Sequence, residues 1–254
     1  MAEKLIQRQA TSAEWELIMA RPENPRYGTM NTPLVMKWFE EKFENDGTVW
    51  FFNLMKYRPF AIYDDGVVTN ITGIEADDLY NPSFNIDEMG GMVAYIGVVV
   101  DQAGSHNPDW HRIATVRYPS RKETLKMFAT PAFIELHEHK DAGMEFTVCA
   151  QTTPSSSGVV VDKGQTVIIV EHESTDAAFD PTSVANSHLV ASFDVEGAIM
   201  GDGRVLRSWH QIQVEGEVDV RKIAALSPHI SVMLMTLEGN PDYVDNTALS
   251  IQTA

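Results

Sequence analysis

The chain contains little cysteine and few basic residues, and both shortages restrict what it can be. Its 254 residues include one cysteine, Cys149, which excludes an internal disulfide. Cys149 stands in an apolar strand pattern, so a buried, unreactive thiol is expected rather than a nucleophile. There are 19 Lys and Arg residues against 36 Asp and Glu, and the formal net charge is −17. A surface this acidic argues against nucleic acid and anionic membranes as partners.

Long apolar runs and common catalytic motifs are also missing. The N-terminal sequence MAEKLIQRQA has no apolar core for a signal peptide, and the longest apolar run, near residues 92–100, is too short to span a bilayer. We therefore expect a cytoplasmic protein that does not enter a membrane. Walker, G-x-G-x-x-G, C-x-x-C and G-x-S-x-G motifs are absent, so nothing in the sequence indicates a nucleotide, a redox dithiol or a serine nucleophile.

Residues 110–150 carry the clearest structural pattern, which predicts a strand, a helix and a returning strand. Residues 110–118 are rich in β-branched and aromatic side chains, as strands are. Ser120 and Glu123 form an S-x-x-E capping box, which favours a helix start. Gly143 is expected to end the helix, and the apolar residues after it predict the second strand.

This stretch resembles a known family. The motifs are WHRIATVRYPS, a T-P-x-F helix, an H-K-x-A-G-M turn, the sequence NLMKY at residues 53–57, and a strand start at Gly90, Gly91 and Tyr95. Together they resemble the dimeric α/β-barrel (ferredoxin-like) superfamily over about residues 47–150. More narrowly, they are similar to its uncharacterised branch of small stress-responsive and cyclase-like domains.

The resemblance implies an α+β fold in which ferredoxin-like sheets close into a barrel. The superfamily hosts many chemistries, so the resemblance does not select one. Some tandem barrels of the superfamily bind haem, but their tyrosine-lysine and arginine pattern is not found here. We therefore expect no cofactor, and a haem-dependent variant stays as an alternative.

We predict tandem ferredoxin-like repeats that form a barrel of the dimeric α/β-barrel type. Residues 1–46 are an N-terminal helical extension, residues 47–150 are the first repeat, and residues 165–254 are a degenerate second repeat inferred from element order. Within the second repeat, residues 183–193 predict a short helix. Residues 151–165 include TTPSSSG, a composition that predicts a linker.

An apolar stripe at helical spacing marks the N-terminal extension. It consists of Leu34, Trp38, Phe39 and Phe43. Such a stripe covers part of the barrel or makes a subunit contact, and we expect a homodimer.

The alternation of side chains along residues 110–118 separates two strand faces. One face is mostly apolar and is assigned to the helix layer. The other carries His111, Thr115 and Arg117, which this assignment directs into a cavity inside the barrel. There Arg117 would bind a carboxylate or enolate oxygen; the alternative is a salt bridge at the surface or between sheets.

Other strands supply further candidates for substrate binding. Asn53 is polar in an apolar strand, which indicates a fixed hydrogen bond, either structural or to a ligand. Tyr95 either lines the cavity or belongs to the core. His210 could contribute from the second half.

The sequence HEH at residues 137–139 does not predict a metal site, because residues i and i+2 of a helix point to nearly opposite sides. Only one of His137 and His139 can face inward. The resemblance favours His139, which would act as a general acid or base. The alternative is a helix-end histidine that complements the helix dipole.

These features predict a cofactor-independent enzyme that acts on a small, largely apolar carbonyl or phenolic substrate in the barrel cavity. The reaction would be proton transfer, isomerisation, cyclisation or oxygenation. His139 or His111 would move the proton, while Arg117 and Asn53 would hold the developing oxyanion. A non-catalytic ligand-binding or stress-response protein is the alternative.

Overall fold

The computed structural model describes residues 27–43, 46–63, 70–106, 109–158, 164–237 and 243–254. The predicted N-terminal extension is therefore described only from residue 27 onward. Among the described residues, no helix is long and apolar enough to cross a membrane.

Eight strands form one closed antiparallel barrel. Their order around the barrel is β7-β5-β2-β4-β3-β9-β6-β8, and β8 pairs with β7 to close it, while the short β1 pairs with the end of β7. The strands are β1 (Thr29–Met30), β2 (Val49–Tyr57), β3 (Met92–Gly104), β4 (Arg112–Tyr118), β5 (Met144–Ser157), β6 (Gln165–His172), β7 (Ser187–Gly201), β8 (Leu206–Val214) and β9 (Ile230–Thr236).

The barrel joins two halves of the chain along two seams. The first half contributes β5-β2-β4-β3 and the second contributes β9-β6-β8-β7, so the seams are β5–β7 and β3–β9. The linker predicted from residue 151 is wrong, because β5 continues to Ser157 and bonds to β7. Register shifts beside Pro154 accommodate its missing N–H.

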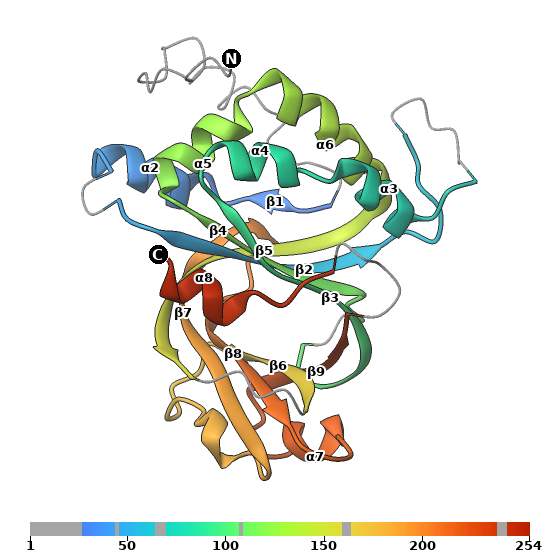
Figure 1. Ribbon diagram of the computed structural model, residues 1–254, viewed down its shortest axis with the longest axis vertical. Coiled ribbons are helices and arrows are strands. Elements are labelled where there is room, and N and C mark those ends of the chain that lie inside the picture. The colour runs from blue at the N-terminus through green and yellow to red at the C-terminus, as the bar shows by residue number, and fades with distance from the viewer. Residues whose placement is uncertain (1–26, 44–45, 64–69, 107–108, 159–163, 238–242) are drawn as a thin grey trace.

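Helices cover the outer face of the first half (Figure 1). They are α2 (Thr32–Glu40), α3 (Gly73–Tyr80), α4 (Ser83–Glu88), α5 (Arg121–Phe128) and α6 (Pro131–Gly143). The predicted cap at Ser120 is formed, since its Oγ accepts the Glu123 N–H at 3.1 Å. The Glu123 carboxylate pairs with Lys126.

The second half has a thinner outer layer, made of the 3-10 turn η1 (Pro181–Ser183) and α7 (Val220–Ala224). The helix predicted at residues 183–193 is wrong. Strand β7 takes most of this segment, because β5 and β8 pair with it on its two sides and satisfy its backbone groups.

Side chains fill the inside of the barrel. The Trp209 ring stacks between Phe193, at 4.2 Å, and Phe52, at 4.5 Å, within a cluster of buried apolar residues. Helix α8 (Thr247–Gln252) contacts β3, β5 and β7 at one end of the barrel, where the Trp50 indole donates to Ser250 Oγ at 2.9 Å. Aromatic side chains from both halves therefore occupy much of the space in which the sequence predicts a ligand cavity.

Candidate functional site

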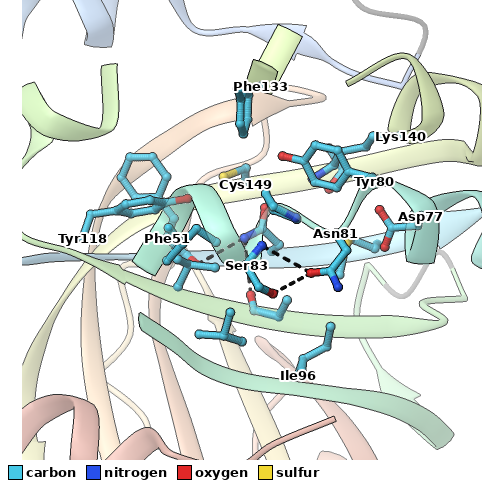
Figure 2. A pocket seen from close by; sticks show the side chains of 18 of the residues that line it. Phe51, Asp77, Tyr80, Asn81, Ser83, Ile96, Tyr118, Phe133, Lys140 and Cys149 are labelled. Carbon is cyan, nitrogen blue, oxygen red and sulfur yellow. Dashed lines mark hydrogen bonds between the residues drawn. The ribbon is translucent and has the colours of Figure 1, made fainter. Parts of the chain in front are cut away.

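A cavity of about 570 Å³ lies outside the barrel, between the helices and the outward face of the first-half sheet (Figure 2). Most of its wall is apolar, as Figure 2 shows around Phe51, Phe133 and Ile96. A volume of this size accommodates a small organic molecule.

Strands β2 and β4 form the floor of the cavity. Their cavity-facing residues alternate along each strand and pair in register, as Phe51 with Val116, Asn53 with Ala114, and Met55 with Arg112. The predicted division of β4 into two faces is confirmed, since the apolar face meets the helices. The side of the sheet that holds the cavity is the opposite of the predicted one.

One end of the cavity is polar and is centred on Arg112, with Asp77 and Asp78 contributed by α3. Arg112 Nη1 donates to Asp77 Oδ2 at 2.8 Å, and Nη2 donates to Asp78 Oδ1 at 2.8 Å and to the Tyr243 hydroxyl. The Tyr57 hydroxyl donates to the same Asp77 Oδ2 at 2.6 Å. The guanidinium also lies 5.3 Å from the ring of Tyr57 and 5.0 Å from that of Tyr243.

Burial sets the protonation states at this end. Burial, and then the charge of Asp77, raise the pKa of Tyr57 well above its ordinary value, so its hydroxyl stays a donor. Burial opposes the charge on Arg112, but the phenol and carboxyl groups around it outweigh burial and raise its pKa. The polar end is therefore a charged, fully protonated guanidinium held by two carboxylates.

The C-terminal segment completes this polar end. Residues 243–246 lie beside the start of β3, where Ile96 N–H donates to the Val244 carbonyl at 2.9 Å and Asn246 N–H donates to the Ala94 carbonyl at 2.7 Å. This pairing places Tyr243 on Arg112. The contact joins parts of the chain that are far apart in sequence, so no local motif marks it.

Three buried polar atoms of residues on the cavity wall have no hydrogen-bond partner among the described residues. They are Trp38 Nε1, Asp77 Oδ1 and Arg112 Nε. Leaving a buried polar group unpaired costs about 1–3 kcal/mol, so such groups are normally satisfied. Each is therefore a candidate contact for a ligand.

Helix α6 places His137, not His139, on the cavity wall. His137 Nε2 is hydrogen-bonded to the Tyr27 hydroxyl at 2.9 Å, and its ring packs edge-on against Tyr80 at 5.6 Å. His139 is hydrogen-bonded to the Tyr63 hydroxyl at 2.8 Å instead. The rule that only one of the pair can face inward holds, and the structure corrects the choice between them, because the two side chains leave the helix in nearly opposite directions.

The predicted residues on the other face of β4 do not line this cavity. His111 Nδ1 accepts the Tyr57 N–H at 3.1 Å, and Thr115 is fully buried on the barrel side of the sheet. Arg117 reaches α8 and donates to the Thr253 carbonyl at 3.0 Å and hydroxyl at 2.7 Å. This face of the sheet therefore packs against the apolar cluster inside the barrel and against α8.

The three remaining candidates lie in three different places. Asn53 lines the cavity, while its amide nitrogen donates to the carbonyls of Phe51 at 3.2 Å and Ala114 at 3.4 Å. Tyr95 is buried in the barrel core, and burial raises its pKa. His210 lies in the second half between Ser192 Oγ and Ser208 Oγ, at 2.8 Å and 3.1 Å, and burial lowers its pKa.

The cavity offers no ready thiolate. Cys149 lies on its wall, and burial raises the pKa of this thiol to about 12. The raised pKa agrees with the unreactive thiol expected from the sequence, although the residue is partly exposed. Among the described residues, no three His, Cys, Asp or Glu side chains are arranged to hold a metal ion.

The sequence analysis did not select Arg112 and Asp77 as site residues, although a sequence pattern that indicates them exists. Arg112 is the one charged residue on the helix-facing side of β4, and an arginine buried there needs an acidic partner. The acidic pair Asp77–Asp78 lies in the preceding crossover, the segment that the fold brings over this face.

The fold and the site define a closed eight-stranded antiparallel barrel with a ligand-sized cavity between its helices and its sheet. No protein-family model matches the chain, and neither does any curated protein. Among solved structures, the methylated RPA0582 protein is 27% identical, with a TM-score of 0.41, and the match covers 47% of this chain and 91% of that one.

Two further solved structures are similar to this chain, also with low TM-scores. The RPA0582 protein of unknown function from Rhodopseudomonas palustris is 25% identical over 45% of this chain and 89% of its own, with a TM-score of 0.38. A "putative monooxygenase" from Lactobacillus acidophilus NCFM is 10% identical over 75% of this chain and 94% of its own, with a TM-score of 0.37. TM-scores this low give no basis for transferring a function.

Proposed function

We propose that the protein binds a small, largely apolar molecule that carries a carbonyl or phenolic oxygen, and that the helix–sheet cavity is its binding site. The carrying observation is the cavity itself: about 570 Å³ of mostly apolar wall with one polar end around Arg112. Such a combination of apolar walls and a few fixed polar groups is typical of small-molecule sites.

A matched pair of variants tests this proposal. Ala114 stands on the floor of the cavity, so Ala114→Phe fills it, whereas Ala132→Phe adds the same ring on the exposed side of α6. Calorimetric titration with small aromatic phenols and ketones should give saturable binding to the wild-type protein and to Ala132→Phe. Binding to Ala114→Phe should weaken at least about tenfold, a change of 1.4 kcal/mol. Equal binding to all three proteins, or to none, contradicts the proposal.

A second candidate function is proton transfer on the bound molecule without a cofactor. It is favoured by His137, which lies on the cavity wall in a hydrogen bond with Tyr27 and would exchange the proton in place of the predicted His139 and His111. Exchange of the methyl protons of 2-acetylnaphthalene in D₂O, followed by NMR, separates an enzyme from a binding protein. Catalysis predicts faster exchange with the wild-type protein and its loss in His137→Gln, whereas binding without exchange leaves only the first proposal.

The proposal also includes descent of both halves from one ferredoxin-like unit within the dimeric α/β-barrel superfamily. The strand order supports it, since β5-β2-β4-β3 and β9-β6-β8-β7 both read fourth, first, third, second in chain order. The second half would have exchanged its first helix for η1 and reduced its second to α7. Only the first half would then retain a helical layer thick enough to enclose a cavity.

A further inference from the structure

We infer that the ligand presents a neutral hydroxyl group to the polar end of the cavity and that Asp77 Oδ1 accepts its hydrogen bond. This inference rests on the proposed ligand site and narrows the ligand from a carbonyl or phenolic molecule to a hydroxyl-bearing one.

The two carboxylate oxygens of Asp77 differ in their environment. Oδ2 accepts two hydrogen bonds, from Tyr57 at 2.6 Å and from Arg112 at 2.8 Å. Oδ1 is buried and has no partner among the described residues, and Asp77 is part of the cavity wall. Because Tyr57 and Arg112 fix the plane of the carboxylate, Oδ1 cannot turn to solvent, and a donor on a ligand would satisfy it.

The charges nearby select the kind of donor. A carbonyl oxygen would place a second acceptor against the carboxylate and leave Oδ1 unpaired. A protonated amine could also donate to Oδ1, but its charge would be buried against a mostly apolar wall beside Arg112, which Asp77 and Asp78 already pair. A neutral hydroxyl avoids both costs, because it donates a hydrogen bond and brings no charge.

Asp78 offers an internal comparison. It also binds Arg112 at 2.8 Å, but its side chain is 41% exposed, whereas the side chain of Asp77 is 7% exposed. Water therefore satisfies Asp78 in the absence of a ligand. Of the two carboxylates, only that of Asp77 needs a hydrogen-bond donor from a ligand.

Four naphthalene probes of similar size test the inference by calorimetric titration at neutral pH: 2-naphthol, 2-methoxynaphthalene, 2-acetylnaphthalene and 2-naphthylmethylamine. The wild-type protein should bind 2-naphthol at least about tenfold more tightly than each of the other three, as expected for one buried charge-assisted hydrogen bond. If 2-methoxynaphthalene binds as tightly as 2-naphthol, the inference is wrong while the proposed cavity site stands. If no probe binds, the proposed function itself fails.

Substitution of Asp77 should reverse the preference. In Asp77→Asn the amide oxygen takes the place of Oδ2, since Tyr57 and Arg112 both donate to it, and the amide nitrogen then faces the ligand as a donor. The variant should bind 2-acetylnaphthalene more tightly than 2-naphthol. Asp78→Asn removes the same charge from the same arginine and should keep the wild-type ratio between the two probes. An unchanged ratio in Asp77→Asn, or the same reversal in Asp78→Asn, overturns the inference; the wild-type probe series decides it even if Asp77→Asn does not fold.

Discussion

Among single residues, His172 couples the stability of the fold to pH. It is buried, its Nε2 is hydrogen-bonded to Ser231 Oγ at 2.9 Å, and its ring lies 4.8 Å from that of His106. Burial, followed by His106, Arg204 and His229 and opposed by Asp202, lowers its pKa from 6.5 to about 4. Between these two values the unfolded chain binds more protons than the folded one, so the free energy of unfolding falls as the pH falls through this window.

The variant His172→Gln should lose this part of the pH dependence, because an amide keeps a hydrogen bond to Ser231 and does not titrate. Urea unfolding of the wild-type protein at pH 7 and pH 5 should show a decrease larger by about 1–2 kcal/mol than that of the variant. His188→Gln is the control, since His188 is an exposed histidine of β7 and should leave the pH dependence as in the wild type. If the free energy of unfolding changes equally with pH in the wild type and in His172→Gln, His172 does not contribute to the pH dependence of stability.

Residue positions on a strand face were predictable, but the place of the cavity was not. Alternation separates Arg112 from Arg117 correctly, since period two is a property of the strand itself. Which side of the sheet encloses a cavity depends on the volume of side chains from both halves, such as Phe52 and Trp209 stacked across the barrel. That volume is a property of the assembled fold, and no window of the sequence contains it.

Among the elements, the crossing of α3 and α6 depends on two glycines in contact. A Cβ at Gly73 would lie 2.3 Å from the Gly143 carbonyl oxygen and 2.6 Å from that of Arg58, both backbone atoms. The sequence predicts Gly143 as the end of a helix, and α6 does end there. The close approach of its backbone to that of Gly73 is the reason that glycine is needed at this position. The start of α3 therefore cannot tolerate a side chain without moving away from α6.

The variant Gly73→Ala should lower the free energy of unfolding by about 1–3 kcal/mol, the usual cost of forcing a methyl group into a filled space. Since α3 carries Asp77, the same variant should also weaken ligand binding. Gly47→Ala is the matched control, because a Cβ there meets nothing within 4 Å. Urea unfolding compares the three proteins; a Gly73→Ala protein as stable as Gly47→Ala would mean that the helices can separate freely.

The sequence predicts the elements that have a local motif such as a helix cap. It does not predict the strand segments that form only because a distant strand pairs with them. Ser120 and Thr130 accept backbone N–H groups at the starts of α5 and α6, and both caps are visible in the sequence. The last residues of β5 and the first residues of β7 have the composition of a linker and a helix, because their strand character comes from the β5–β7 seam. A partner strand from the other half of the chain supplies the hydrogen bonds that the local sequence cannot specify.

For the whole molecule, closure within one chain bears on the oligomeric state. The sequence predicts a homodimer from the apolar stripe around Trp38. In the structure Trp38 is buried, and Phe39 and Phe43 pack against the same outer cluster of apolar side chains. The β5–β7 and β3–β9 seams close the barrel without a second copy, so both features that would recruit a partner are satisfied internally.

We therefore expect a monomer, with a mass by light scattering near 28.3 kDa that does not change with concentration. The reason is that a closed barrel leaves no long unpaired strand edge for a second chain to join. A mass of two chains would support the homodimer that the sequence predicts. A second chain would then cover the outer side of α2, where Met36 is exposed, and would press on the cavity through Trp38 of the same helix.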